Sequence, residues 1–342
     1  MFAELPEIDR RLLNEFQRDL PLCGQPFLEI GATLGISETE TLDRLAALWQ
    51  DGLISRVGAT IRPNTAGAST LAAMSVPQED IDTVAAIVGR EPGVNHSYLR
   101  EHRWNLWFVV TAPDRDALDA CLSRIRKQAR LELLDLRLVR AFNIDLGFSL
   151  TDAKRKTGPG QAVNQAAILD SDRPILDALS RGLPLVSRPF AELGTMLGRS
   201  EADILQRISS LLAAGILTRL GVIVKHRKIG WNANAMVVWQ VPEDAISEAG
   251  AALAAHPGIT LCYQRNTVPG LWPFTLFSMI HARSRGEALG VLEGARNLGP
   301  LRSIPHEVLF STRCFKQTGA MINATGERQV NHETHAVTRA HA

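Results

Sequence analysis

The spacing of apolar residues near the N-terminus has a helical period and then a strand period. The first apolar stripe predicts a short helix and consists of Ile8, Leu12, Leu13 and Phe16. PFLEIGATLG predicts a second helix and ETETLDRLAALWQ a third, for which Ser37 and Glu40 form a capping box. LISRVGATI then alternates as a strand. Residues 1–62 are therefore expected to form a winged helix-turn-helix.

The apolar pattern of residues 63–148 predicts strand, helix, strand, strand, helix and strand. The four strand segments read STLAAMSV, VNHSYLRE, RWNLWFVVTA and LELLDLRLVRAF. This order is typical of a ferredoxin-like βαββαβ domain, in which two helices cover one face of an antiparallel sheet. The other face is left open, and a large exposed apolar face needs a partner or a ligand to cover it.

The whole pattern occurs twice along the chain. Arg56 matches Arg219 at an offset of 163 residues, and Arg100 matches Arg265 at an offset of 165. Leu106-Trp107 is aligned with Leu271-Trp272 at that same offset. The fold class is thus α+β, a tandem duplication of a winged helix-turn-helix and a ferredoxin-like domain. The second copy is expected over residues 168–225 and 226–320, after a linker at 149–167 and before a disordered tail at 321–342.

Composition narrows the class of protein. The chain has 342 residues, is 45% hydrophobic and 21% charged, and carries a net charge of +1. It has no overall surplus of Lys and Arg of the kind that favours nucleic-acid binding. Four scattered cysteines give no disulfide framework or zinc motif. Without a signal-peptide pattern or an apolar run of about 20 residues, we expect a cytoplasmic protein that does not cross a membrane.

Candidate site residues gather on two neighbouring strands and one basic turn. Alternation in VNHSYLREH places His96, Tyr98, Arg100 and His102 on one strand face. Asn105 and Trp107 share a face of the next strand. The second copy has Tyr263 and Arg265 at the positions that match Tyr98 and Arg100. The second copy has Leu261 and Thr267 in place of the two histidines. In contrast, only the second copy has the basic cluster Lys225, His226 and Arg227.

We expect the two open sheet faces to pair within the chain, which makes an intramolecular pseudo-dimer with one composite site. Further pairing of chains into a homodimer stays open. Each candidate also has a structural alternative. Arg100 and Arg265 could form ion pairs between the sheets, and either histidine alone could be structural. His281 and His306 are expected at strand ends and receive no role.

A winged helix followed by βαββαβ resembles the Lrp/AsnC-like superfamily. Within it, NHSYLREHRWNLWFV and KHRKIGWNANAMVVWQVP resemble the sirohaem decarboxylases, and the likeness covers about residues 5 to 320. The resemblance implies a fused form of two subunits that removes two acetate carboxyl groups from sirohaem. The product would be didecarboxysirohaem, for the biosynthesis of haem or of d-type haem. It implies no cofactor beyond the iron that the substrate carries.

That reaction suggests roles for the candidates. His96 and His102 are expected to be catalytic, as proton donors, and one of them could bind the substrate iron. The expected substrate-binding residues are Tyr98, Arg100, Asn105, Trp107, Lys225, His226, Arg227, Tyr263 and Arg265. Arginines suit the carboxylates of an iron tetrapyrrole, and an indole suits its flat face.

The alternative is an Lrp/AsnC-like transcriptional regulator. Its recognition helices should present basic or amide side chains to DNA. The third helix of the first copy instead offers Glu38, Glu40, Asp43 and Arg44, and the second copy offers Glu201, Asp203, Gln206 and Arg207. Acidic side chains at both helix N-termini oppose phosphate binding, so specific DNA binding is not expected.

Overall fold

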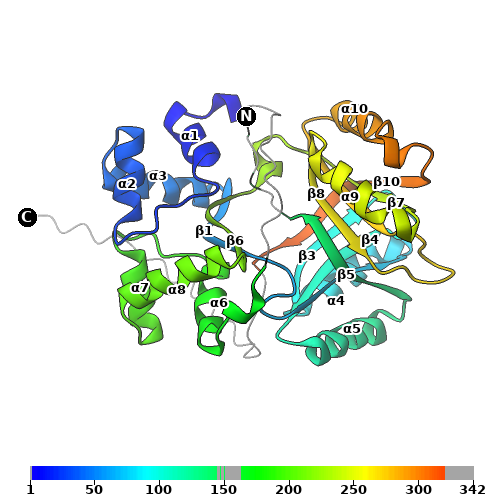
Figure 1. Cartoon of the computed structure of the whole chain (residues 1–342), viewed down its shortest axis with the longest axis horizontal. Coiled ribbons are helices and arrows are strands. Elements are labelled where there is room, and N and C mark those ends of the chain that lie inside the picture. The colour runs from blue at the N-terminus through cyan, green and yellow to red at the C-terminus, as the bar shows by residue number, and fades with distance from the viewer. Residues whose placement is uncertain (1, 145–146, 148–149, 151–162, 320–342) are drawn as a thin grey trace, which may run out of the picture.

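The computed structural model describes residues 2–144, 147, 150 and 163–319, and it contains two winged helices side by side (Figure 1). The first comprises α1 (Glu7–Glu15), α2 (Pro26–Leu34), α3 (Glu38–Gln50) and β1 (Ile54–Ile61). The second comprises α6 (Arg173–Arg181), α7 (Pro189–Leu197), α8 (Glu201–Ala213) and β6 (Leu217–Val224). The expected N-caps form in both copies. Ser37 Oγ accepts the Glu40 amide at 3.1 Å, and Ser200 Oγ accepts the Asp203 amide at 3.2 Å.

The two wings form one sheet. β1 pairs antiparallel with β6, and Gly58 lies opposite Gly221 at the centre of the pairing. A Cβ on Gly58 would lie 2.4 Å from the Leu179 carbonyl oxygen, and one on Gly221 would lie 2.5 Å from that of Gln17. Neither position tolerates a side chain because the backbone of a neighbouring segment packs directly against the wing. The helices and wings of both copies bury a single shared apolar core.

The two ferredoxin-like domains join into one closed eight-stranded barrel. The first contributes β2 (Ala68–Met74), β3 (Val94–Arg100), β4 (Leu106–Ala112) and β5 (Leu133–Asn143). The second contributes β7 (Ala233–Trp239), β8 (Ile259–Arg265), β9 (Leu276–Ala282) and β10 (His306–Gln317). Their helices lie on the outside of the barrel and are α4 (Ile81–Arg90), α5 (Arg115–Ala129), α9 (Ile246–Ala255) and α10 (Arg285–Arg296) (Figure 1).

Two long strands close the barrel. β5 pairs with β2 through its first half and with β8 through its second half, while β10 pairs with β7 and then with β3. The two sheets therefore join at their edges, and their expected open faces become the barrel interior. Closure satisfies both strand edges without a second chain. The α+β duplication and the intramolecular pseudo-dimer expected from the sequence are both confirmed.

The interior aromatic cluster corrects one part of the repeat alignment. Leu106 pairs with Met74, and in the other half Leu276, not Leu271, pairs with the equivalent Trp239. The counterpart of Trp107 is therefore Phe277. Trp272 belongs to a longer loop before β9, and its ring packs edge-on against Trp107 with centroids 5.2 Å apart. The extra loop residues fill one side of the barrel interior with aromatic side chains.

Most of the expected linker and all of the expected tail, residues 149, 151–162 and 321–342, lie outside the described residues. The end of the linker is described and forms a short 3-10 helix, Gln165–Ala167. None of the described helices has the length and apolar character that a membrane crossing requires.

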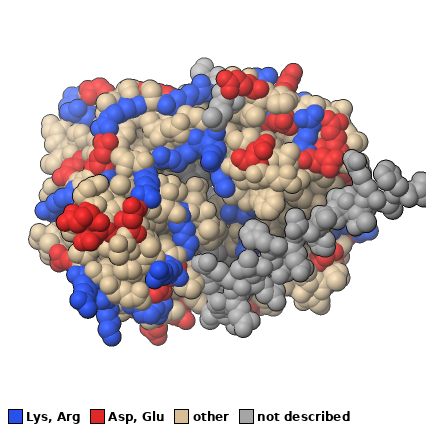
Figure 2. All heavy atoms as spheres, turned by 180° about the vertical axis from the view of Figure 1, so that it is seen from behind, with Lys and Arg blue, Asp and Glu red and all other residues tan. Residues whose placement is uncertain are grey.

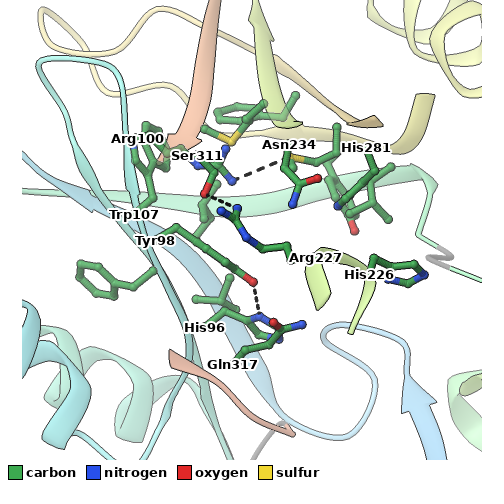
Figure 3. Close-up of a pocket in the computed structure, with 18 of the residues that line it drawn as sticks. His96, Tyr98, Arg100, Trp107, His226, Arg227, Asn234, His281, Ser311 and Gln317 are labelled. Carbon is green, nitrogen blue, oxygen red and sulfur yellow. Dashed lines mark hydrogen bonds between the residues drawn. The ribbon is translucent and has the colours of Figure 1, made fainter. Parts of the chain in front are cut away.

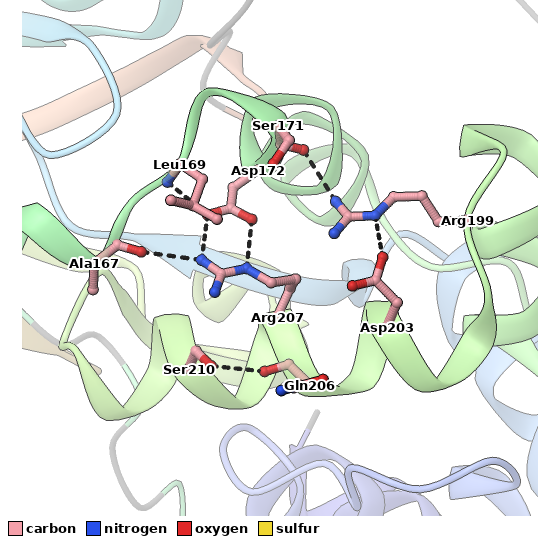
Figure 4. Close-up of polar contacts among 9 residues, drawn as sticks. All are labelled: Ala167, Leu169, Ser171, Asp172, Arg199, Asp203, Gln206, Arg207 and Ser210. Atoms are coloured by element: carbon pink, nitrogen blue, oxygen red, sulfur yellow. Dashed lines mark hydrogen bonds and ion pairs between the residues drawn. The ribbon is translucent and has the colours of Figure 1, made fainter.

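The recognition helix α8 is anchored by a buried ion pair (Figure 4). Arg207 Nη2 lies 2.6 Å from Asp172 Oδ2, and the Asp172 side chain has no exposed surface. Burial opposes ionisation of Asp172, yet hydrogen bonds from Arg207 and the Leu169 amide outweigh it and lower its pKa. The first copy has the equivalent pair Arg44 and Asp9 in a more exposed setting, with side-chain exposures of 29% and 14%.

Replacing Arg207 by alanine is expected to lower the free energy of unfolding by about 3 kcal/mol, because it leaves a buried carboxylate without its charge partner. The matched variant Arg44→Ala should cost about 1 kcal/mol or less, since water screens and replaces that pair. Urea unfolding of both variants measures the difference. Equal losses would contradict the role assigned to burial.

Candidate functional site

A cavity of about 280 Å³ lies inside the barrel and is lined by residues from both halves (Figure 3). Its aromatic and apolar walls include Trp107, Phe108, Tyr263 and Phe277. Its basic side chains are Arg100, Arg227, Arg265, His96, His226 and His281. The combination of flat apolar walls with several cationic groups suits a planar ligand that carries negative charge.

Strand β3 supplies three of the expected residues to this cavity. A register shift between Val94 and His96 precedes the alternation that places His96, Tyr98 and Arg100 in the wall. His96 Nδ1 and the Tyr98 hydroxyl oxygen are 3.0 Å apart (Figure 3). Burial, with a smaller contribution from the charge of Arg56, lowers the pKa of His96 to about 4. His96 is therefore neutral at pH 7 in the empty site.

Arg100 and Arg265 occupy equivalent places in the two halves. Arg100 Nη1 donates to the Leu309 carbonyl at 3.1 Å, and Arg265 Nη1 donates to the Leu136 carbonyl at 2.9 Å. Burial lowers the pKa of each guanidinium to about 10, and each Nε lacks a hydrogen-bond partner. Within the described residues neither arginine has a carboxylate partner. The described residues thus give no ion pair between the sheets at either arginine, and the Nε of each guanidinium has no hydrogen-bond partner there.

The second half adds a polar corner that the first half lacks. His226 and Arg227 come from the 3-10 turn His226–Ile229, and Arg227 Nη1 lies 3.3 Å from Ser311 Oγ (Figure 3). Asn234 on β7 pairs across the strands with His281 on β9, and Ser69 and Thr111 occupy these places in the first half. Burial, then the neighbouring His281, lowers the pKa of His226 to about 3.

His281 and Asn234 are cavity residues that sequence reasoning missed. His281 Nδ1 lies 2.7 Å from Thr260 Oγ1, which also lies 3.0 Å from the Met279 carbonyl oxygen. Because the Thr260 hydroxyl donates to that carbonyl, it accepts from His281 Nδ1–H. The alternation of Phe277, Met279 and His281 in one strand could have revealed this residue. Aligning Trp272 instead of Phe277 with Trp107 shifted the expected strand and so concealed the position of His281.

Three sequence-predicted residues do not line this cavity. His102 lies beyond the end of β3 at Arg100, and its Nε2 is 2.6 Å from Glu307 Oε2 beside a different cavity of about 480 Å³. Asn105 instead fixes the backbone of Val76 with two hydrogen bonds of 2.9 and 2.8 Å. Lys225 caps the turn before His226 and is absent from the lining. Strand alternation stops where β3 ends, so the expected placement of His102 on that strand face is corrected. Asn105 is held directly before β4 by the Val76 backbone, and Lys225 precedes the turn, so both lie outside the cavity lining.

A second cavity of about 290 Å³ adjoins the first, between the wing sheet and the barrel. The two share His96, Val109, His226 and Gln317. Arg56, Arg62 and Arg219 line the second cavity, and no Asp or Glu is among the described lining residues of either. Figure 2 shows basic side chains around a hollow near the middle of one face of the molecule. The two adjoining cavities are lined by six arginines in total, which excludes a purely apolar ligand.

Comparisons with known proteins agree with this organisation. A model of the AsnC-like ligand binding domain matches residues 66–143 and 228–316. A model of the Siroheme decarboxylase NirDL-like HTH domain matches residues 9–54 and 172–217. The Siroheme decarboxylase NirDL subunit of Paracoccus pantotrophus is 58% identical over 319 residues, which cover 93% of this chain and 98% of that protein. Siroheme decarboxylase of Hydrogenobacter thermophilus is 32% identical over 311 residues, which cover 90% of this chain and 92% of that protein.

Solved structures give the same result. A crystal structure of the siroheme decarboxylase NirDL has a TM-score of 0.66 at 30% identity and covers 92% of this chain and 94% of that chain. A second, in co-complex with an iron-uroporphyrin III analogue, has a TM-score of 0.64 at 29% identity, with coverage of 92% and 93%. The fold and cavity thus define a fused, duplicated protein of the AsnC-like class. Within that class the chain belongs to the sirohaem decarboxylase NirDL family and is an enzyme, a carboxy-lyase.

Proposed function

We propose that this enzyme decarboxylates two acetate side chains of sirohaem to give didecarboxysirohaem, for the formation of haem or d-type haem. The observation that carries the proposal is the pair of adjoining cavities, each lined by three arginines and by no described carboxylate, with aromatic walls inside the barrel. Sirohaem is a flat macrocycle with eight carboxylates. Its charge would compensate buried guanidiniums that otherwise lose hydration without a partner.

The arginines of the barrel interior are proposed to hold carboxylates that do not react. Loss of CO₂ requires the electron pair of the C–C bond to move onto the adjacent carbon. A guanidinium that grips the reacting carboxylate would stabilise the starting state and slow this step. Arg100, Arg227 and Arg265 therefore position spectator carboxylates, while Tyr98, Trp107 and Tyr263 contact the macrocycle. The reacting acetate would lie in a drier part of the cavity, near an imidazole.

Each turnover consumes one proton per acetate. The C–CO₂ bond breaks, CO₂ leaves, and the carbanion on the ring-bound carbon becomes a methyl group when it is protonated. This balance requires a positioned acid but no organic cofactor, and the only metal is the iron that the substrate carries. We propose His96 as the first candidate donor, because it lies in the cavity and its counterpart in the second half is Leu261.

One imidazole of the cavity can instead bind the substrate iron. His96, His226 and His281 all line the cavity, so the iron-ligand role first considered for His96 or His102 falls to one of these three. Loss of an iron ligand and loss of a proton donor have different effects on the absorbance spectrum of the bound tetrapyrrole. Removal of an axial ligand shifts the Soret band of the bound tetrapyrrole, whereas removal of a proton donor stops the reaction and leaves that band in place.

The direct test is anaerobic titration of the purified protein with sirohaem, followed by mass spectrometry of the extracted tetrapyrrole. The expected result is a saturable absorbance change and the loss of two CO₂ units from each sirohaem. A protein that binds sirohaem and removes no CO₂ would overturn the proposed reaction.

Substrate binding is expected to take up protons. The pKa of His96 is about 4 in the empty protein and that of His226 about 3, so both are neutral at pH 7. Carboxylates placed nearby favour the imidazolium and raise these pKa values. Proton uptake on binding should therefore occur at pH values between the pKa of each histidine in the empty protein and its pKa in the complex. It should vanish at pH values above the pKa in the complex. Calorimetric binding of iron uroporphyrin III in buffers of different ionisation enthalpy measures it. Heats independent of the buffer would contradict the expected charging.

Specific binding of duplex DNA is not expected. The arginines of the recognition helices are held by the protein itself, Arg44 by Glu40 and Asp9, and Arg207 by Asp172 (Figure 4). The two winged helices also contact each other, since Ser187 Oγ donates to Glu38 and accepts from Gln25. A mobility-shift titration should detect no sequence-selective complex. A salt-dependent, sequence-selective shift at nanomolar protein would support the regulator instead.

A further inference from the structure

The hydroxyl group of Tyr98 has no role in the reaction described above, although the tyrosine ring lines the cavity. Tyr98 Oη lies 3.0 Å from His96 Nδ1, and the two rings are stacked with centroids 6.1 Å apart and an interplanar angle of 28° (Figure 3). Among the described residues, this contact is the one hydrogen bond of the His96 side chain. The orientation of the imidazole therefore depends on this tyrosine.

Tyr98 is held on both sides by the strands next to β3. Trp107 of β4 and Cys314 of β10 lie directly opposite it in the two strand pairings. The Arg100 guanidinium lies over its ring, with Cζ 5.7 Å from the ring centroid. Burial raises the pKa of Tyr98, so the hydroxyl group keeps its proton at pH 7. A fixed and neutral hydroxyl group therefore lies beside the His96 ring.

A hydroxyl group can hold one nitrogen of an imidazole in either protonation state, because it both donates and accepts hydrogen bonds. When His96 is neutral with its proton on Nε2, the Tyr98 hydroxyl donates to Nδ1. When the ring is charged, Nδ1–H donates to Tyr98 Oη. Nδ1 is occupied in both states, so Nε2 is the nitrogen that remains for a ligand in the cavity.

The second half has the same tyrosine without the histidine. Tyr263 on β8 is the counterpart of Tyr98, and Leu261 occupies the place of His96. Both tyrosines line the cavity, and Arg265 Cζ lies 5.2 Å from the centroid of the Tyr263 ring. The two halves thus share the tyrosine ring and the arginine beside it. At these equivalent positions, contact between a hydroxyl group and an imidazole is confined to the first half.

We propose that Tyr98 is a positioning residue whose hydroxyl group fixes the His96 ring so that Nε2 delivers the proton to the decarboxylated carbon. The proposal rests on the proposed function, with His96 as the donor. When CO₂ leaves, the electron pair of the broken C–C bond takes the proton from Nε2–H of the imidazolium and forms the new C–H bond. His96 becomes neutral and keeps its other proton on Nδ1. Tyr98 Oη accepts from Nδ1–H before and after this transfer, so no group has to reorient.

The test is a double-mutant cycle with Tyr98→Phe, His96→Ala and the protein that carries both substitutions. Phenylalanine keeps the ring in the cavity wall and removes the hydroxyl group alone. Single-turnover rates of CO₂ loss from sirohaem are measured by mass spectrometry, and the Kd for iron uroporphyrin III is measured by absorbance titration. Thermal midpoints of the unliganded proteins show that each variant is folded.

Tyr98→Phe should slow CO₂ loss about 10- to 100-fold, the range expected when a hydrogen bond to a charged group is lost, and should raise the Kd less than about threefold. In the His96→Ala protein the same substitution should change the rate less than about twofold, because the imidazole that it positions is absent. Tyr263→Phe removes the matching hydroxyl group of the second half. Whatever its effect on the rate, that effect should be the same with and without His96.

Equal losses of rate from Tyr98→Phe in the two backgrounds would overturn the positioning role, since a contact that acts on the macrocycle or on stability does not depend on His96. A shift of the Soret band without a loss of rate would also overturn it, because the hydroxyl group would then orient an iron ligand. If Tyr98→Phe keeps the rate of a wild-type protein that decarboxylates sirohaem, the positioning role fails and the proposed function stands. If the wild-type protein removes no CO₂, the proposed function fails and the positioning role fails with it.

Discussion

Alanine in place of His96 is expected to slow decarboxylation of sirohaem by about 10²- to 10⁴-fold, the usual contribution of a positioned general acid. Binding should persist, because the arginines and aromatic walls of the cavity remain. The measurement is a single-turnover reaction in which mass spectrometry counts the CO₂ units lost from bound sirohaem. A fall in rate without a matching rise in Kd would identify a role in the chemical step.

His102→Ala provides the control. His102 is paired with Glu307 beside a different cavity, so this variant should keep the wild-type rate. Adding Leu261→His to the His96→Ala protein should not restore activity. The basic turn that contains His226 and Arg227 occurs only in the second half, and the first half has Pro63 and Asn64 near the equivalent place. If His96→Ala removes both carboxyl groups at the normal rate, His226 and His281 become the candidate donors.

Alanine in place of Arg100 is expected to act mainly on binding. Removing one partner of a buried, hydrogen-bonded charge pair costs about 2–5 kcal/mol, so the Kd for iron uroporphyrin III should rise by at least about 30-fold. The rate of saturated enzyme should change much less, since the proposed role is to hold a carboxylate that does not react. Absorbance titration gives the Kd, and single-turnover kinetics give the rate.

The equivalent variant Arg265→Ala tests whether both halves bind the ligand. Both guanidiniums are anchored to a backbone carbonyl in the same way, so we expect similar losses of affinity. A large loss in one variant and none in the other would contradict a composite site. A loss of rate with no loss of affinity at Arg100 would mean that this arginine acts in the chemical step.

The cavity residues that the two halves contribute are not equivalent. His96, Asn234 and His281 are replaced by Leu261, Ser69 and Thr111 at the equivalent places of the other half. His96 comes from the first half and His226 and His281 from the second, and all three line the same cavity. We therefore expect the two acetates of one sirohaem to react in turn at the same set of imidazoles.

The sequence by itself determined the features that depend on local periodicity. The stripe from Ile8 to Phe16, the Ser37 and Ser200 N-caps, and the alternation of Tyr98 with Arg100 are all properties of single elements. The duplication was also readable, because both copies keep residues such as Arg56 and Arg219 at a constant offset. These features needed no knowledge of which segments meet in space.

Only the tertiary structure decided where the elements end and what covers them. β3 ends at Arg100, which removes His102 from the face that its spacing suggested. A longer loop before β9 moves Trp272 into the barrel interior and His281 into the cavity wall. Barrel closure depends on β5 and β10 extending into the other half, where each satisfies an otherwise unpaired edge. Such pairing follows from long-range hydrogen bonds and burial, which the period of a single strand does not encode.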